Sequence, residues 1–257
     1  MRKPVLLALV VLLAACERPP GEDFKPVLNV HCLLVSHGAS THGRVEVDVD
    51  RTYAIGETTR YVDLDSVKVL LWRNHEWQPY GFDGWPAGGW YMSRRECTIQ
   101  PGDTFRLRVS AFGFDTVFGR TVVPDSFTVV APRDSDVVRV TDSIVWTRSP
   151  SCGGYFFSYA EYWWMPGNPW FEFKVPNDSL AGRLPMFFFT GQYNKILMLY
   201  VMALDSNYYD WARGTAEKMQ PEQPRQESRL TGGVGVFGSA YACSLRVVVL
   251  PDSVQQQ

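Results

Sequence analysis

The nine residues PGDTFRLRV, 101–109, decide the fold class of this chain. Pro-Gly-Asp is a turn signal, and in the six residues after it polar and apolar side chains alternate strictly. A period of two places alternate side chains on opposite faces of a β-strand. The stretch therefore predicts a turn followed by a half-buried strand over 104–109.

The residues on both sides of this strand carry similar patterns. Residues 44–50 alternate polar and β-branched side chains, and 27–35, 67–72 and 115–123 are further strand-like runs. No good helical pattern precedes residue 130. Short strands separated by turns predict an all-β fold with an immunoglobulin-like antiparallel β-sandwich over residues 27–134.

A polar, proline-containing stretch at 132–136 predicts a domain boundary near residue 135. We expect residues 135–257 to form a second β-rich domain. One short helix is predicted near 206–218, with Ser206 as its N-cap. The expected strands of this domain cover residues 143–147, 155–164, 170–175, 186–190, 196–204 and 241–250.

The N-terminus MRKPVLLALVVLLAAC, 1–16, has the pattern of an export signal, with a basic start and an apolar run too short to span a bilayer. Leu-Ala-Ala-Cys resembles the lipobox of bacterial lipoproteins, which implies that Cys16 becomes the lipidated N-terminus. We expect membrane contact through this lipid, a tether over 17–26, and a location in the cell envelope, at the outer membrane. The alternative is an ordinary signal peptide with a chance cysteine.

Composition narrows the class of partner. The 257 residues carry a formal net charge of -2, which argues against nucleic acid, because phosphate binding needs clustered Lys and Arg. Aromatic residues make up 14% of the chain and charged residues 20%, which fits an aromatic-rich β protein.

Four cysteines remain after Cys16. Because export permits disulfides, and because two cysteines lie in each half of the chain, we expect the pairs Cys32–Cys97 and Cys152–Cys243, although four cysteines allow three connectivities. The rival interpretation is a zinc site. No C-x-x-C pair is present, so no metal or other cofactor is expected.

Motifs for catalysis are weak. His31, His37 and His42 could converge at one end of a hairpin to bind a metal, but they lack metal-ligand spacing, and we interpret them as exposed loop residues. There is no G-x-S-x-G nucleophile motif. The stretch GGVGVFG, 232–238, lacks the strand-to-helix context of a nucleotide-binding loop and is interpreted as a bulged or tightly packed strand. A hydrolase stays the least favoured hypothesis.

The Trp-rich segment 72–91 is the strongest candidate binding surface. Its aromatic residues lie among Gly and Pro, where burial of all of them in regular strands is hard to arrange. Exposed aromatic side chains stack on sugar rings or fill a pocket in a partner. We expect Trp77, Tyr80, Trp85 and Trp90 to form this surface; the alternative is a packed cap over one end of the sandwich.

Several of these motifs occur together in one known family. The lipobox, PGDTFRL, VPDS at 123–126, LDSNYY at 204–209 and the glycine-rich stretch 232–238 together resemble the bacterial lipoprotein family catalogued as domain of unknown function 4249, found in Bacteroidetes envelopes. Members are often encoded beside TonB-dependent receptors. The resemblance implies an accessory role with an outer-membrane β-barrel partner and offers no catalytic residues. The four extra cysteines and the Trp-rich segment depart from it.

The sequence as a whole predicts a lipid-anchored, non-catalytic binding or accessory protein of the cell envelope. It favours membrane attachment and an outer-membrane protein as a partner. A glycan bound by the Trp-rich segment is the alternative.

Overall fold

The computed structural model describes residues 24–38, 41–53, 57, 64, 66–74, 76, 78–84, 89–161, 171–176, 182–186, 192, 194–217 and 229–251. In this part of the chain nearly all regular structure is β-strand, with a single helix, α2. The predicted all-β fold is confirmed. Cys16, Trp77 and Trp85 lie outside the described residues, as do parts of the strands predicted at 155–164, 170–175 and 186–190.

The first part of the chain forms short strands in a largely antiparallel arrangement. They are β1 (Leu28–His37), β2 (Thr41–Gly43), β3 (Glu46–Arg51), β4 (Lys68–Arg73), β5 (Tyr80–Gly84), β6 (Trp90–Ser93), β7 (Cys97–Ile99), β8 (Thr104–Ser110) and β9 (Val117–Val122). The strand predicted over 104–109 is β8. In the Trp-rich segment 72–91, the described residues include the end of β4, all of β5 and the start of β6.

The second part contains the helix and the longest strand. Its elements are β10 (Val129–Ala131), β11 (Asp136–Arg139), β12 (Ser143–Trp146), β13 (Gly154–Glu161), β14 (Phe171–Pro176), β15 (Arg183–Pro185), β16 (Lys195–Leu204), α2 (Ser206–Glu217) and β17 (Val234–Leu250).

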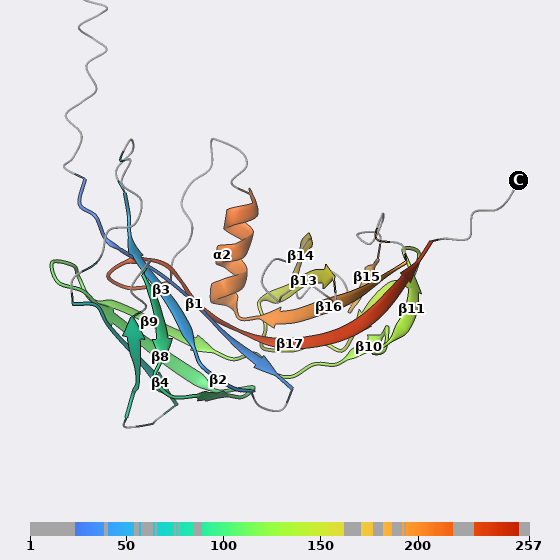
Figure 1. Cartoon of the computed structure of the whole chain (residues 1–257), viewed down its shortest axis with the longest axis horizontal. Helices are drawn as coiled ribbons and strands as arrows, with labels where there is room; N and C mark the ends of the chain where they lie inside the picture. Colours follow the sequence, from blue (N-terminus) through green and yellow to red (C-terminus); the bar gives the residue numbers. More distant parts are fainter. Residues whose placement is uncertain are drawn as a thin grey trace, which may run out of the picture.

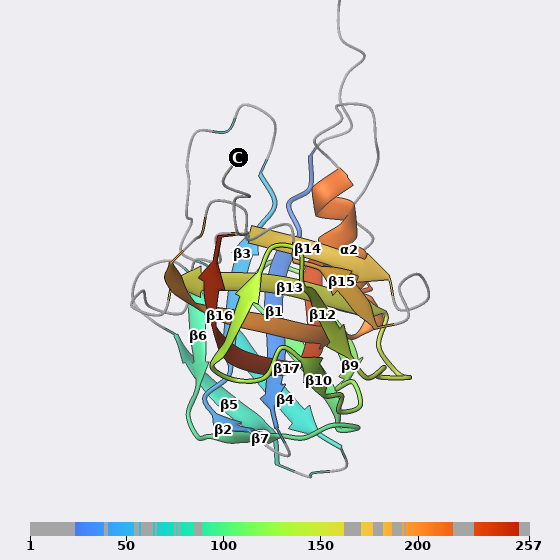
Figure 2. The same ribbon diagram turned by 90° about the vertical axis from the view of Figure 1, so that its right-hand side faces the viewer.

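Each part encloses its own hydrophobic core. In the first, the order β17-β1-β3-β6-β5-β4-β8-β9 curls around a core that includes Leu28, Phe105 and Phe237, and β2 pairs with β7 in a small separate sheet. In the second, β14-β13-β16-β17 and the small sheet β10-β12-β15 contribute to a core that includes Trp146 and Phe157. Figure 2 shows β10, β12 and β15 in front of β13 and β16.

Strand β17 belongs to both parts. Residues 234–242 pair in parallel with β1, and residues 240–249 pair antiparallel with β16. At its far end β17 also pairs with β11. Figure 1 shows β17 running along the molecule from β1 and β9 to β11. The first sandwich is therefore completed by a strand from the end of the chain, and the residues that build most of the second lie between β9 and β17.

The glycines of the stretch 232–238 allow close packing around β17. Gly235 has φ +106°, and a Cβ there would lie 2.1 Å from the carbonyl oxygen of Val30. A Cβ on Gly238 would lie 2.6 Å from Cβ of Tyr208 in α2. Only glycine fits such contacts without a backbone shift. The interpretation of this stretch as a tightly packed strand is confirmed.

A buried polar cluster joins β9, α2 and β17. The Thr121 hydroxyl donates to Oδ2 of Asp205 at 2.6 Å and lies 2.7 Å from the Ser239 hydroxyl. The Tyr208 amide donates to Oδ1 of Asp205 at 2.9 Å, so the N-cap of α2 is Asp205, and the prediction of Ser206 was wrong by one residue. Burial raises the pKa of Asp205.

Replacing Asp205 should destabilise the protein. Asp205→Ala removes the helix cap and the acceptor for the Thr121 hydroxyl, which should lower the free energy of unfolding by about 2–4 kcal/mol. Asp205→Asn keeps an oxygen for the Tyr208 amide and should cost roughly 1 kcal/mol. Urea unfolding of both variants measures this; equal stability of the alanine variant and wild type would contradict the role of the cluster.

Candidate functional site: an aromatic cleft and an arginine groove

The Trp-rich segment places its described aromatic residues in different environments. Trp90, the first residue of β6, is 58% exposed. Tyr80 is only 5% exposed, because it occupies an inward position of β5, so its prediction as a surface residue was wrong. The Arg95 guanidinium lies 4.3 Å from the centre of the Tyr80 ring, and burial raises the pKa of Tyr80 to about 12.

Trp90 lies at a cleft of about 260 Å³, which we call the Trp90 cleft. Across neighbouring strands, His31 of β1 lies opposite Asp48 of β3, and Asp48 lies opposite Trp90. Directly paired residues project to the same face of a sheet, so these three side chains form one row. Tyr208 and Trp211 of α2 also line the cleft.

The aromatic rings of the cleft contact one another. The rings of His31 and Trp211 meet edge to face, with centroids 5.3 Å apart, and those of Tyr208 and Trp211 are 5.4 Å apart. His31 Nε2 lies 3.0 Å from the side-chain oxygen of Asn29. Burial lowers the pKa of His31, which favours the uncharged ring at neutral pH.

Carboxylates complete the lining. Glu46 and Asp48 are two residues apart on β3 and therefore face the same side. The pKa of Asp48 is raised, first by partial burial and then by the charges of Asp50 and Glu46. Neither Glu46 nor Asp48 forms an ion pair with any residue that the structure describes. The cleft combines ring faces with oxygen acceptors.

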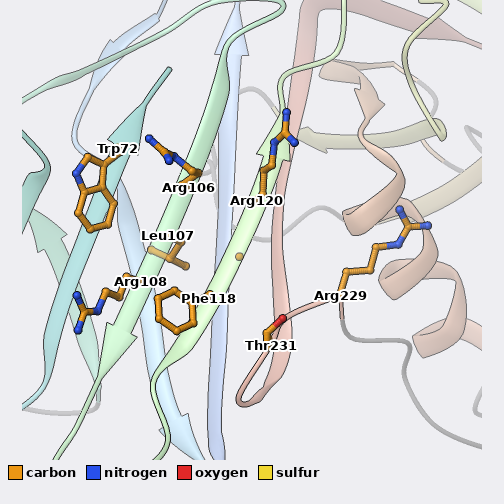
Figure 3. Close-up of a pocket in the computed structure, with 9 residues that line it drawn as sticks. Trp72, Arg106, Leu107, Arg108, Phe118, Arg120, Arg229 and Thr231 are labelled. Carbon is orange, nitrogen blue, oxygen red and sulfur yellow. The ribbon is translucent and has the colours of Figure 1, made fainter. Parts of the chain in front are cut away.

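A second depression, the arginine groove, lies on the outer face of β4, β8 and β9 (Figure 3). Its volume is about 530 Å³. Its polar and aromatic lining residues are Trp72, Arg106, Arg108, Phe118, Arg120, Arg229 and Thr231.

The strand register orders the groove into two rows. Arg106 lies opposite Trp72 on one side and opposite Arg120 on the other. Two residues along β8, Arg108 lies opposite Phe118, with its guanidinium carbon 5.9 Å from the ring centre. Arg229 also lines the groove; its side chain extends beside α2 and is paired with Asp210.

Three of these arginines have no acidic partner among the described residues. In the described part of the chain, Arg106, Arg108 and Arg120 form no salt bridge; Arg106 donates only to the carbonyl oxygen of Asn74, at 3.5 Å. Sequence reasoning missed this surface because a net charge of -2 conceals a local positive patch. The alternating Arg106 and Arg108 were the available signal.

The candidate metal ligands are not brought together. His31 lies in the Trp90 cleft, His37 ends β1, and His42 on β2 has its Nδ1 3.0 Å from the Thr98 hydroxyl. The Ser36 hydroxyl is buried and donates to the carbonyl oxygen of Ile99. Among the described residues, no three His, Cys, Asp or Glu side chains are grouped to hold a metal ion.

The predicted disulfides are not formed: Cys32, Cys97, Cys152 and Cys243 carry reduced thiols. Each predicted pair does lie within one hydrophobic core. The Cys243 thiol donates to the Phe127 carbonyl oxygen at 3.5 Å, whereas Cys152 bonds to Tyr155 and Ser149. The Cys97 thiol donates to the carbonyl oxygen of Thr98 at 3.8 Å and forms no bond to Cys32.

The buried thiols should react slowly. Burial raises the pKa of Cys97 to about 11, and burial together with the nearby Cys97 charge raises the pKa of Cys32 further. Because the thiolate is the nucleophile, iodoacetamide at pH 7.5 should leave Cys32 and Cys97 unmodified in the native protein and alkylate both in 8 M urea. Peptide mass spectrometry reads this out. Native alkylation at the rate of the unfolded chain would contradict the burial of these thiols.

In the described part of the chain, no helix is long and apolar enough to cross a membrane. No family model matches the sequence. No curated protein matches it either.

Solved structures show only weak likeness. The alignment with a chain from the complex of Dpr11 IG1 with DIP-gamma covers 89% of this chain and 99% of that chain, at 8% identity and a TM-score of 0.23. It aligns over 88% of its length with 97% of a titin Ig tandem, at 7% identity and 0.23. The alignment with three N-terminal domains of the bacteriophage RB49 outer capsid protein Hoc covers 89% of this chain and 71% of that chain, at 10% identity and a TM-score of 0.24. Scores of this size support no argument about function.

Proposed function

We propose that this chain is a lipid-anchored, non-catalytic binding protein of the bacterial cell envelope, and that the Trp90 cleft holds a glycan. The observation that carries the ligand class is the row of His31, Asp48 and Trp90 beneath the aromatic side of α2. The anchor rests on the lipobox at Cys16 and on the family resemblance.

The chemistry of the cleft suits a sugar. A pyranose ring has an apolar face that stacks on an indole, and covering the exposed face of Trp90 removes apolar surface from water. Hydroxyl groups around the same ring can donate to Glu46 and Asp48, and the uncharged His31 can donate or accept. A volume of about 260 Å³ lies near the lower end for small-molecule sites, which suits a short glycan segment.

The placement of the carboxylates supports binding over hydrolysis. A glycosidase needs two carboxyl groups that flank the scissile bond. Glu46 and Asp48 project from the same face of one strand, so both would approach a sugar from one side. This arrangement supports a role as hydrogen-bond acceptors.

An accessory role beside an outer-membrane transport protein is a second proposal, supported by the resemblance to the lipoprotein family alone. A β-barrel partner and glycan binding are compatible, because the lipid holds the Trp90 cleft near the membrane.

Removing the Trp90 ring should weaken glycan binding. With cello-, xylo- and manno-oligosaccharides as probes, Trp90→Ala should raise the Kd at least tenfold for whichever probe binds, and Trp90→Phe should raise it less. Phe112→Ala is the matched control, because Phe112 is an exposed aromatic residue (79%) in a turn away from the cleft. Calorimetry measures the Kd; unchanged affinity of the Trp90→Ala variant would exclude the cleft as the site.

Removing the lipobox cysteine should release the protein from the membrane. Cys16→Ser should abolish incorporation of radiolabelled palmitate and move the protein from the detergent phase to the aqueous phase in Triton X-114 partition, because no hydrocarbon anchor is attached. Cys243→Ser is the control and should stay in the detergent phase. Equal palmitate labelling of the Cys16→Ser variant and wild type would refute the anchor.

A further inference from the structure

The arginine groove brings like charges together without neutralising them. Arg106 and Arg120 lie directly opposite each other on β8 and β9, and like charges in such a pair destabilise a sheet. Neither has an acidic partner in the described part of the chain. An anion placed between the two guanidinium groups would relieve the repulsion.

Guanidinium chemistry defines the charged part of the ligand. Each guanidinium presents a planar fork of N–H donors that matches the oxygens of a carboxylate or a phosphate. Arg106 and Arg120 project from regular paired strands, so the sheet fixes the positions from which the two side chains extend. Arg108 adds a further charge two residues along β8.

The groove is extended beyond this pair. A depression of about 510 Å³ lined by Asn74, Thr104, Arg106 and Arg120 adjoins it. Another, of about 230 Å³, is lined by Arg120, Arg229 and residues at the start of α2. Arg120 lines all three depressions, Arg106 also lines the first of these two, and Arg229 also lines the second. A ligand that filled all three would therefore be a chain of several units.

The aromatic side chains define the uncharged part. Trp72 lies opposite Arg106, and Phe118, which is 50% exposed, lies opposite Arg108. Each row of the groove therefore places an aromatic ring beside an arginine. A sugar chain with acidic substituents offers apolar ring faces beside anionic groups, whereas an acidic peptide offers carboxylates on flexible aliphatic stems.

Charge density argues for a sparsely charged chain. A nucleic acid carries a phosphate on every unit, and its binding depends on many cations and on a favourable overall charge. This protein carries a net charge of -2, and four arginines line the groove among the residues that the structure describes.

We propose that the arginine groove binds an acidic oligosaccharide, one whose sugar rings carry carboxylate or phosphate groups. Arg106 and Arg120 hold the anionic group between them, and Trp72 and Phe118 cover neighbouring ring faces. This site is separate from the Trp90 cleft and does not depend on it.

The test is calorimetry on the full chain in neutral detergent at 50 mM salt, with oligogalacturonate and a phosphorylated mannan fragment as probes. At least one should bind, and raising the salt to 300 mM should weaken it severalfold. Arg106→Gln/Arg120→Gln should raise the Kd at least tenfold. The control is Arg139→Gln, on β11 at the opposite end of the molecule, and should leave the Kd unchanged.

Three further probes decide the ligand class. Methyl-esterified oligogalacturonate should bind at least tenfold more weakly, because its charge is removed. Oligoglutamate and single-stranded oligothymidylate should also bind more weakly than the acidic sugar. Failure of both acidic sugars, or tighter binding of the peptide or the nucleic acid, would overturn the proposal.

Two readouts keep the result interpretable. The double glutamine variant should melt at the wild-type temperature or above, because it removes a like-charge pair; a lower Tm would contradict the repulsion inferred here. Trp90→Ala should leave acidic-sugar binding unchanged, and the double glutamine variant should leave neutral-sugar binding unchanged. If acidic-sugar binding fails while neutral-sugar binding at the Trp90 cleft is seen, this inference fails and the proposed function stands. If only neutral-sugar binding fails, the proposed function of the cleft fails and this inference stands.

Discussion

The two-sided pairing of β17 is the constraint on which the rest of the structure depends. One strand supplies the parallel partner of β1 and the antiparallel partner of β16. Its residue Phe237 packs in the first core, and Leu245, Val247 and Val249 pack in the second. Neither sandwich is complete until the end of the chain is in place, so folding of both parts depends on contacts far apart in sequence.

The region where β17 passes from the first part to the second also positions the candidate sites. Asp205 caps α2 and is tied to Thr121 of β9, and Gly238 lets the helix approach β17 closely. This contact sets Tyr208 and Trp211 above the row that contains His31 and Trp90. On the other side of the crossing, the amide and carbonyl groups of Phe118 bond to those of Thr231, which aligns β9 with the loop that carries Arg229.

The sequence predicts the local structure better than the sites. Alternation in 104–109 and 44–50 predicts β8 and β3, because burial on one face leaves a period of two in the sequence. The same reasoning predicts that the last strand begins at residue 241, because glycines weaken strand signals. In the structure β17 begins at Val234, and its glycines allow close packing. Trp90 and His31 were each noticed, but their cross-strand neighbours depend on register, which local patterns do not contain. The pairing of Arg106 with Arg120 also depends on strand register. Whether two cysteines in one core form a disulfide depends on their three-dimensional placement, which the sequence does not contain either.

Both proposed sites use rigid strands as platforms, and their geometry holds only if the two parts behave as one cooperative unit. Amide hydrogen exchange across a urea series tests this directly. The account predicts that amides of β1 and of β16 lose protection at the same urea concentration, together with residues 234–249 of β17. Loss of protection in β1 and β8 at lower urea, while β13 and β16 remain protected, would contradict it.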